Sequence, residues 1–349
     1  MSDPILALVE RGLVPDALVR MGIRDLCARK ARLERAGGPA AMAARAAAVR
    51  EAMRTAPIAL HTREANTQHY EVPAAFYTHV LGPRMKYSSA WWGEGVRTLA
   101  EAEDAMLALT CERALLADGQ RILELGCGWG SLTLWMAEHY PDARITAVSN
   151  SASQRAFILG RAAERGLGNV EVITADMNAF TPPTSERFDR VVSVEMFEHM
   201  RDWEGLLARI RGWLAPDGAL FVHVFCMRDA SYVFEVDGRS DWMARHFFTG
   251  GLMPSETLLA ECATGFRLDE RWRVNGVHYA RTSRAWLDRQ DAAREAILPI
   301  LAATHGDADA ALAFQRWRMF FMACEELFGF GTGEDWFVTH ARLVPRSEG

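Results

Sequence analysis

Lysine is almost missing from this chain: Lys30 and Lys86 are the only two lysines among 349 residues, and arginine supplies nearly all of the basic charge. The formal net charge is −6, so the sequence lacks the strong positive charge that favours binding of a polyanion. A local basic face is not excluded by this balance. We nevertheless expect no nucleic-acid partner.

Paired cysteines and long apolar runs are missing too. The six cysteines are scattered, without a CxxC pair or the spacing of a disulfide framework, which favours a reducing compartment. No stretch approaches the roughly 20 apolar residues that cross a bilayer, and the first residues do not have the pattern of a secretory signal. We therefore expect a cytoplasmic protein. No set of His, Cys and carboxylate residues has convincing ligand spacing, so we expect no metal site.

What the chain does contain is typical of a folded enzyme-sized protein. Half of the residues are hydrophobic, 10% are aromatic and 24% are charged, which excludes a disordered or collagen-like chain. The length is enough for one large domain with additions, or for two domains. Residues 1 to about 60 predict helices with a break at Gly37-Gly38-Pro39, and residues 61–92 carry too many aromatic side chains for a simple linker.

From Arg121 onward, short apolar runs alternate with helical stretches, which predicts βαβ units and a parallel sheet covered on both faces. The expected strands are residues 121–125, 145–149, 170–174, 188–194 and 219–225, with helices at 131–139, up to Arg165 and around 203–214. Residues 227–254 are irregular and aromatic-rich. After them we expect a short helix that Ser255 caps, a strand at 267–274, a helical region at 281–328 with a break near 305–306, and a last strand at 336–344.

The strongest local signal is the run Glu124-Leu-Gly-Cys-Gly-Trp-Gly130, between the first expected strand and a helix. Glycines let the backbone turn sharply and approach a ligand closely. The spacing is not that of a dinucleotide fold, and Ser149-Asn150 stand where a nicotinamide site would want a carboxylate. The run resembles the signature of class I S-adenosylmethionine (SAM) methyltransferases, in which Glu124 would orient the loop or the amino-acid part of SAM.

Two further patterns carry chemistry. Asp176-Met177 follow the third strand, where that fold places its adenine contacts, although an Asp after a strand can also be a turn residue. Glu195, Glu198 and His199 would share one helical face if a helix began after the fourth strand, so that they could hold an ammonium and accept its proton. The alternatives for this cluster are a cap or a salt bridge. Zinc binding is not expected, since Glu-x-x-Glu-His lacks the first histidine of a zinc motif.

Several motifs in order resemble the cyclopropane-fatty-acyl-phospholipid synthase family. They are His69-Tyr-Glu-Val-Pro73, Leu81-Gly-Pro-Arg-Met-Lys-Tyr-Ser88, the 124–130 loop, Val194-Glu-Met-Phe-Glu-His199 and Tyr279-Ala-Arg-Thr282. Within that family, some segments are more similar to plant coclaurine N-methyltransferases and their relatives. These are residues 221–226, 241–245, 247–251 and 317–330, together with Val14-Pro-Asp-Ala-Leu18.

The resemblance implies an α/β fold with the Rossmann-like sheet of class I SAM methyltransferases, an N-terminal helical extension and a helical insertion or lid over the substrate site. It divides the chain into a helical cap and cofactor-closing segment at 1–115 and a methyltransferase domain at 116–349, with the insertion and helices at about 227–330. By resemblance, Tyr70 would close over SAM. The remaining SAM site would comprise Tyr87, Ser88, Glu124, Gly126, Gly128, Gly130, Ser149, Asn150, Gln154, Asp176 and Met177.

The resemblance also suggests catalytic residues. Glu195, Glu198 and His199 match the cluster that such N-methyltransferases use near the substrate amine. Cyclopropane synthases hold a bicarbonate with a Glu, a His, a Tyr and a Cys, of which Glu198, His223 and Tyr279 match three. Ser89 replaces the cysteine, which weakens the case for bicarbonate-assisted cyclopropanation, and Cys324 matches a cysteine of the family's C-terminal helix.

We therefore expect SAM-dependent N-methylation of a small aromatic or alkaloid-like amine. The alternatives are methylene transfer to unsaturated lipid acyl chains at a phospholipid membrane surface, with bicarbonate as base, and a non-catalytic SAM-binding protein. The oligomeric state stays open, with a homodimer as one form. Candidates for an aromatic cage around a cationic amine are Trp91, Trp92, Phe247, Phe248, Trp317, Phe320 and Phe321.

Overall fold

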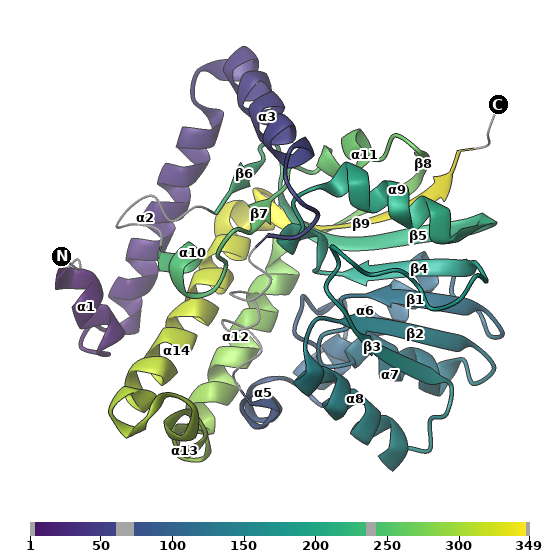
Figure 1. Ribbon diagram of the computed structural model, residues 1–349. Helices are drawn as coiled ribbons and strands as arrows, with labels where there is room; N and C mark the ends of the chain where they lie inside the picture. Colours follow the sequence, from purple (N-terminus) through teal and green to yellow (C-terminus); the bar gives the residue numbers. More distant parts are fainter. Residues whose placement is uncertain (1–3, 61–72, 235–241, 347–349) are drawn as a thin grey trace.

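The computed structural model describes residues 4–60, 73–234 and 242–346, and within them a seven-stranded sheet lies beside a group of helices (Figure 1, sheet at the right). The strand order is β3-β2-β1-β4-β5-β9-β8. The strands are β1 (Arg121–Leu125), β2 (Arg144–Ser149), β3 (Val170–Thr174), β4 (Phe188–Val194), β5 (Leu214–Met227), β8 (Phe266–Val274) and β9 (Trp336–Pro345). A separate two-stranded sheet pairs β6 (Tyr232–Val233) with β7 (Leu252–Met253).

The alternation of side chains along the strands gives the sheet two apolar faces. Ile122 packs on one side with α6 (Leu99–Arg113) and α7 (Ser131–His139), while its neighbour Leu123 packs on the other side with α9 (Trp203–Trp213). α8 (Ala152–Glu164) packs against β2 and β3 through Ile158. The sequence-based prediction of a class I methyltransferase sheet covered by helices is confirmed.

One strand differs from the predicted parallel sheet, because β9 runs antiparallel to both of its neighbours, β5 and β8. The cause is the helical region between β8 and β9. α12 (Gly276–Ala292) leaves the sheet directly after β8, and α13 (Arg294–His305) and α14 (Asp307–Gly329) bring the chain back to the same edge. Gly276 at the start of α12 lies against the carbonyl groups of Phe328 and Trp336. A strand that starts from this edge must run in the opposite direction.

Several element boundaries differ from the sequence analysis, and β5 begins at Leu214 rather than at residue 219. The helical region begins at Gly276 rather than at residue 281, and it is interrupted at Ala293 as well as at Gly306. The short helix α11 spans Leu258–Cys262, so Ser255 does not cap it. The Ser255 N–H is instead bonded to the Ser231 hydroxyl, and the residue forms an isolated bridge with Met227.

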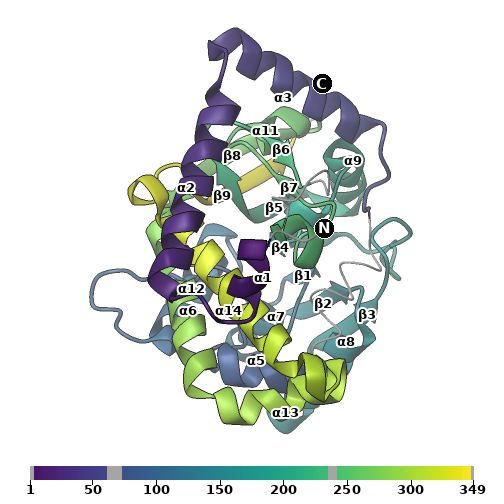
Figure 2. The same ribbon diagram turned by 90° about the vertical axis from the view of Figure 1, so that its left-hand side faces the viewer.

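The N-terminal helices α1 (Pro4–Glu10), α2 (Asp16–Arg35) and α3 (Gly38–Arg54) are also confirmed, and α2 lies across α14 (Figures 1 and 2). A short α5 (Ala74–Val80) packs beside α12 and α13. α6 belongs to the predicted cap at 1–115 but packs on the sheet, and the division into 1–115 and 116–349 stays a prediction.

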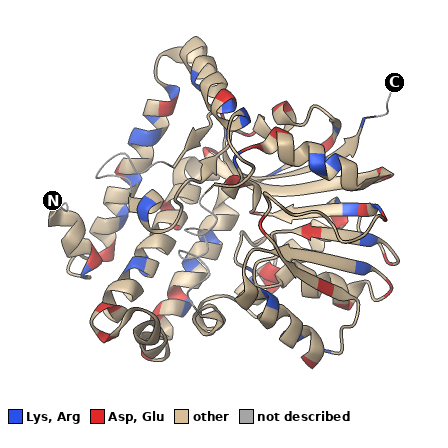
Figure 3. Cartoon of the chain, viewed as in Figure 1, with Lys and Arg blue, Asp and Glu red and all other residues tan. Residues whose placement is uncertain are grey.

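Basic and acidic positions are interspersed over the helices and strand ends (Figure 3). Among the described residues, no helix is both long and apolar enough to cross a membrane.

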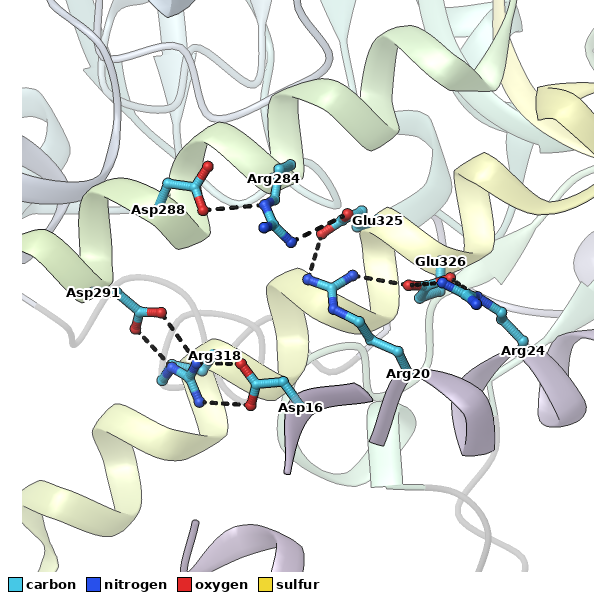
Figure 4. A network of polar contacts seen from close by, with 9 residues as sticks. All are labelled: Asp16, Arg20, Arg24, Arg284, Asp288, Asp291, Arg318, Glu325 and Glu326. Carbon is cyan, nitrogen blue, oxygen red and sulfur yellow. Dashed lines mark hydrogen bonds and ion pairs between the residues drawn. The ribbon is translucent and has the colours of Figure 1, made fainter. Parts of the chain in front are cut away.

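Ion pairs join α2 to α14 (Figure 4). Arg20 donates to Glu325 and Glu326, at 2.8 Å each, and Arg24 donates to Glu326 at 2.5 Å. Further along α14, Arg318 bridges Asp16 of α2 and Asp291 of α12. The side chains of Arg20 and Glu326 are only 11% and 9% exposed, so this contact is shielded from solvent. The N-terminal helices therefore brace the helix whose other face lines the pocket described below.

We expect Glu326→Ala to lower the free energy of unfolding by about 2 kcal/mol, because it leaves the shielded Arg20 and its neighbour Arg24 without this acceptor. Denaturant unfolding measures the change. The control is Asp25→Ala, which removes an exposed i,i+4 ion pair with Arg29 within α2. It is expected to lower the free energy of unfolding by less than about 0.5 kcal/mol. Equal losses in the two variants would contradict a stabilising role for the α2–α14 contact.

Candidate active site

A pocket opens at the carboxyl edge of the parallel strands, which is the position where open α/β sheets bind their ligands. Its walls come from the loops after β1, β2 and β4, from the segment 85–88, and from α12 and α14. Apolar and aromatic side chains dominate one part of the wall, and the glycine loop forms another. The site therefore combines a cofactor loop with an apolar chamber.

Each of the three positions in the loop needs a glycine for a different structural reason. All have positive φ, of 81° at Gly126, 52° at Gly128 and 80° at Gly130. A Cβ at Gly126 would lie 2.6 Å from a Met196 side-chain atom, and one at Gly130 would lie 2.6 Å from Ile158. A Cβ at Gly128 would meet nothing within 4 Å, and Gly128 lines the pocket. Gly128 is thus the glycine whose missing side chain leaves space for a ligand.

Next to the loop, buried polar groups line the same part of the pocket. Glu124 is 2% exposed and accepts a hydrogen bond from Thr133, and burial raises its pKa to about 7. The Ser149 hydroxyl donates to Gln154 Oε1 at 2.6 Å. The side-chain nitrogen of Gln154, Nε2, has no hydrogen-bond partner among the described residues. A buried unpaired donor inside a pocket fits a site that a polar ligand completes. These residues fit the amino-acid and ribose parts of SAM.

Most of the predicted SAM residues are brought together. Nine of them line the pocket: Tyr87, Ser88, Glu124, Gly126, Gly128, Ser149, Asn150, Gln154 and Met177. Gly130 is not among the lining residues, and neither is Asp176, whose carboxylate accepts the backbone N–H of Asn178 in a turn. Tyr70 lies outside the described residues. The individual cofactor contacts stay predictions.

The carboxylate of Glu195 has the most hydrogen-bond partners of the predicted catalytic groups in the pocket. Its Oε1 accepts the backbone N–H of Ser89 at 2.9 Å and lies 3.1 Å from His223 Nε2, while Oε2 accepts the Tyr279 hydroxyl at 2.6 Å. Burial raises the pKa of Glu195, and the positive charge of Lys86, the Tyr279 hydroxyl and the Ser89 N–H oppose part of this rise. A carboxylate held in one orientation with a raised pKa suits a general base near neutral pH.

The predicted helix after β4 does not form, and this changes the cluster. Glu195 has a φ of +47°, outside helical geometry, and only a single 3-10 turn at Phe197–His199 follows. Glu195, Glu198 and His199 therefore do not share one helical face. The positive φ turns Glu195 back toward Ser89 and Tyr279 instead, a strained conformation for a residue with a side chain.

Glu198 is fully buried and is not among the residues that line the pocket. Its catalytic role stays a prediction. Burial and then the nearby charge of Glu195 raise its pKa well above the ordinary value, which favours the neutral acid. The His223 and Tyr279 side chains that were expected to act with Glu198 both contact Glu195, and His223, also fully buried, lies behind it.

Three other groups lie around the same pocket. His199 lines it and packs edge-on against Phe248, with 4.8 Å between the ring centroids. Cys324 lines it from α14, and burial raises its pKa well above the ordinary value, so it is a protonated thiol. Lys86 was not predicted: it is buried in the wall, donates to Ser88, and burial lowers its pKa to about 8. Lys86, one of the chain's two lysines, is thus the cation whose charge lowers the pKa of Glu195.

The aromatic lining differs from the predicted cage. Of the seven candidates only Phe248 and Phe320 line the pocket. Trp92, Phe247, Trp317 and Phe321 are packed in the core, and Trp91 stacks on His278. The other aromatic walls come from Tyr87, Trp129, Phe225, Phe234, Tyr279, Trp286 and Phe328. Helical spacing alone does not tell a core face from a pocket face, which is why the sequence did not separate them.

Ser89 also acts differently from the expectation. Its hydroxyl bonds to the carbonyl of Ala90, and its backbone N–H is the group that reaches the Glu195 carboxylate. The substitution of cysteine by serine at this position therefore leaves the donor to the carboxylate unaffected. Any residue other than proline at position 89 can supply this bond.

Metal chemistry leads to one prediction here. In the described part of the chain, no group of three or more His, Cys, Asp or Glu side chains could hold a metal ion. We expect turnover to be unchanged after treatment with EDTA, because a buried carboxylate can accept the proton without a Lewis acid. A loss of turnover that one particular divalent ion restores would contradict this.

With this geometry established, the chain can be compared with known proteins. A family model described as mycolic acid cyclopropane synthetase matches residues 59–334. This chain belongs to that family. Cyclopropane-fatty-acyl-phospholipid synthase of Escherichia coli (strain K12) is 31% identical over 224 residues, 64% of this chain and 55% of that protein.

Two further relatives cover almost the whole chain. (S)-coclaurine N-methyltransferase of Thalictrum flavum subsp. glaucum is 36% identical over 340 residues, 96% of this chain and 94% of that protein. A crystal structure of coclaurine N-methyltransferase bound to N-methylheliamine and SAH is similar with a TM-score of 0.93 and 34% identity, covering 97% of this chain and 98% of that one. The chain is a SAM-dependent methyltransferase, and the predictions of family, fold, enzyme class and cofactor are confirmed.

Proposed function

We propose that this methyltransferase N-methylates a small aromatic or alkaloid-like amine in the pocket beside Glu195. One observation supports this most directly: a carboxylate belonging to the chain itself accepts the Ser89 N–H and the Tyr279 hydroxyl and contacts His223. The base is thereby fixed inside an apolar pocket next to the glycine loop. An amine needs such a base, because an alkylamine is mostly protonated at neutral pH.

The chain's residues divide the work as follows. The loop at 126–128 with Glu124, Ser149 and Gln154 would hold SAM, which supplies an electrophilic methyl group when bound. Glu195 binds the ammonium by charge and takes its proton, and Tyr279 and the Ser89 N–H keep the carboxylate aimed at the pocket. Aromatic walls such as Phe248 and Phe320 suit a flat, cationic substrate. Positioning of the nucleophile supplies much of the remaining rate enhancement.

The relatives support an amine as acceptor. Coclaurine N-methyltransferase of Thalictrum is named for this reaction on coclaurine, and the similar crystal structure holds N-methylheliamine, an N-methylated amine. Both cover more than nine-tenths of this chain. The N-terminal residues 4–54, which lie outside the match to the family model, fall within these longer similarities.

The second candidate is methylene transfer to unsaturated acyl chains at a phospholipid surface. It is favoured by the similarity to the Escherichia coli synthase and by the apolar wall of the pocket. That reaction would need bicarbonate at the donors of Ser89, His223 and Tyr279. The carboxylate of Glu195 uses these donors, which favours the amine. A non-catalytic role is disfavoured because the glycine loop and the base are both in place.

Three further expectations belong to this proposal. A cytoplasmic location fits the six cysteines, none of which forms a disulfide in the described structure. A homodimer stays a prediction. Contact with a membrane surface is expected only under the lipid alternative.

The proposal is tested by a screen for SAM turnover on tetrahydroisoquinoline amines. The matched control is the isochroman that carries oxygen in place of nitrogen. We expect a product heavier by one methyl group from the amine, with the methyl on nitrogen, and no product from the oxygen analogue. Turnover of neither compound, nor of any other secondary amine in the screen, would overturn the proposal.

A further inference from the structure

A row of polar side chains leads from Glu195 along the face of the sheet that α6 covers, to the last residue of that helix. In the strand register, Val194 of β4 lies beside His223 of β5, and His223 lies opposite His340 of β9. Residues directly opposite each other on paired strands project from the same face. Phe221, two residues before His223, packs with α6, so this is the face that α6 covers.

The distances in this row are those of hydrogen bonds. Arg113, the last residue of α6, approaches His340 Nδ1 with its Nη1 at 2.9 Å. His340 Nε2 lies 2.9 Å from His223 Nδ1, and His223 Nε2 lies 3.1 Å from Glu195 Oε1. Both imidazoles are fully buried, and the Arg113 guanidinium stacks over the ring of Trp272 on β8. Arg113, His340 and His223 thus connect the end of α6 to the base.

Arginine sets the direction of every hydrogen bond in the row, because a guanidinium only donates. His340 Nδ1 must accept from Arg113, so a neutral His340 carries its proton on Nε2 and donates to His223 Nδ1. A neutral His223 then carries its proton on Nε2 and donates to the Glu195 carboxylate. Burial lowers the pKa of both histidines well below the ordinary value, with Arg113 adding to the effect, so the neutral forms apply.

We propose that Arg113 and His340 are positioning residues for the methyl-transfer reaction, which fix the tautomer of His223 so that it donates to Glu195 and stabilises the ionised base. The orientation begins at Arg113, at the end of α6 and outside the residues that line the pocket. When Arg113 is removed, the row can also run in reverse, with His223 Nε2 presenting a lone pair to the carboxylate. That arrangement disfavours the ionised carboxylate and raises the pH at which Glu195 loses its proton.

The same row prevents loss of the proton toward α6. A proton that Glu195 takes from the substrate could pass through two imidazoles only if the last group were able to accept a hydrogen bond. Arg113 has no acceptor. The proton therefore leaves through the pocket, and the row serves to orient the base and not to conduct protons.

Other ionisable groups act on the two ends of the row. Around Glu195 they are Lys86, Glu198, His199, Tyr279 and Cys324. Around Arg113 they are Glu112 and Glu270. None of these contacts is altered by a substitution at His340 itself. A change at His340 consequently reports on the row alone.

The first test reads the tautomers directly and does not depend on any substrate. In protein labelled with ¹⁵N histidine, nitrogen chemical shifts distinguish the two neutral tautomers, and His340→Gln and His223→Gln assign the two signals among the ten histidines. We expect both residues as the Nε2–H tautomer near pH 7, and a mixture for His223 in Arg113→Gln. An Nδ1–H tautomer of His223 in the unsubstituted protein would overturn the proposal.

The second test is the pH dependence of kcat for the amine reaction, and this part rests on the proposed function. Arg113→Gln and His340→Leu are expected to move the acid limb upward by about one pH unit. They would lower kcat about tenfold at a pH below that limb, with recovery at high pH and an unchanged KM for SAM. His340→Gln, whose amide can both accept from Arg113 and donate to His223, is expected to restore the original limb.

The matched control is Arg273→Gln. Arg273 stacks over Phe337 as Arg113 does over Trp272, and it pairs with Glu256 outside the row. It is expected to change stability without moving the acid limb. A uniform loss of kcat at every pH in Arg113→Gln, or the same limb in His340→Leu and His340→Gln, would overturn the proposal. If the tautomers are as expected but no amine is methylated, the row stands and the proposed function fails.

Discussion

Gly128→Val is expected to abolish measurable SAM binding, a loss of at least about a hundredfold in affinity by calorimetry, while the protein stays folded. A valine at this position would project into the pocket, where the added Cβ meets nothing within 4 Å and where we place the cofactor. Gly126 and Gly130 are less useful for this test. Their side-chain space is filled by Met196 and Ile158, so substitution there disturbs the protein itself.

The control is Gly166→Val. Gly166 also has a positive φ, of 68°, and open space around its added Cβ, but it does not line the pocket. The backbone strain of a side chain at positive φ, about 1–2 kcal/mol, is therefore common to both variants. We expect both to lose stability and only Gly128→Val to lose SAM. Retained SAM affinity in Gly128→Val would refute the cofactor site.

Glu195→Gln is expected to lower kcat on an amine by about 10²–10⁴-fold, the usual contribution of a general base, with little change in SAM affinity. The glutamine keeps the size of the side chain and an oxygen that can accept the Ser89 N–H, with its amide nitrogen toward the Tyr279 hydroxyl, but it cannot take a proton. Steady-state kinetics from acid to alkaline pH measure the effect. His199→Ala is expected to lower turnover as well, since His199 lines the same pocket.

The pH dependence has a definite sign. Burial raises the pKa of Glu195, and the active form is the ionised one, so turnover of the unsubstituted enzyme falls as pH falls through that raised value. The deficit of Glu195→Gln should shrink at high pH, where solvent supplies free amine. Glu198→Gln removes a carboxyl of equal size outside the pocket and should have a much smaller effect. A larger loss in Glu198→Gln than in Glu195→Gln would contradict the assigned base.

Local sequence patterns were sufficient for the cofactor half of the site. Strands β1 to β4 and the loop after β1 depend on alternating apolar residues and on glycines, which are properties of short segments. The nine predicted SAM residues that line one pocket were placed there by the resemblance to a family signature, which includes the 124–130 loop. Asp176 does not line the pocket, its carboxylate accepts the Asn178 N–H in the turn after β3, and its contact with the adenine stays a prediction.

The acceptor half depends on contacts between distant segments. Glu195 adopts a positive φ while its carboxylate binds Ser89 and Tyr279, 106 and 84 residues away. No local pattern predicts such a conformation for a glutamate, and the helix expected after β4 is replaced by a single 3-10 turn. His340 was missed because β9 inserts between β5 and β8, and only that topology brings it next to His223.

The central claim is that the acceptor is an amine nitrogen, deprotonated by a base that belongs to the chain. Its most direct test is a competition reaction that contains the enzyme, SAM with a labelled methyl group, a tetrahydroisoquinoline amine and vesicles of unsaturated phospholipid. It is run with and without added bicarbonate and followed by mass spectrometry of all products. Our account predicts label on the amine nitrogen and none in the acyl chains. A mass gain of one methylene in the acyl chains, with no label on the amine, would contradict it.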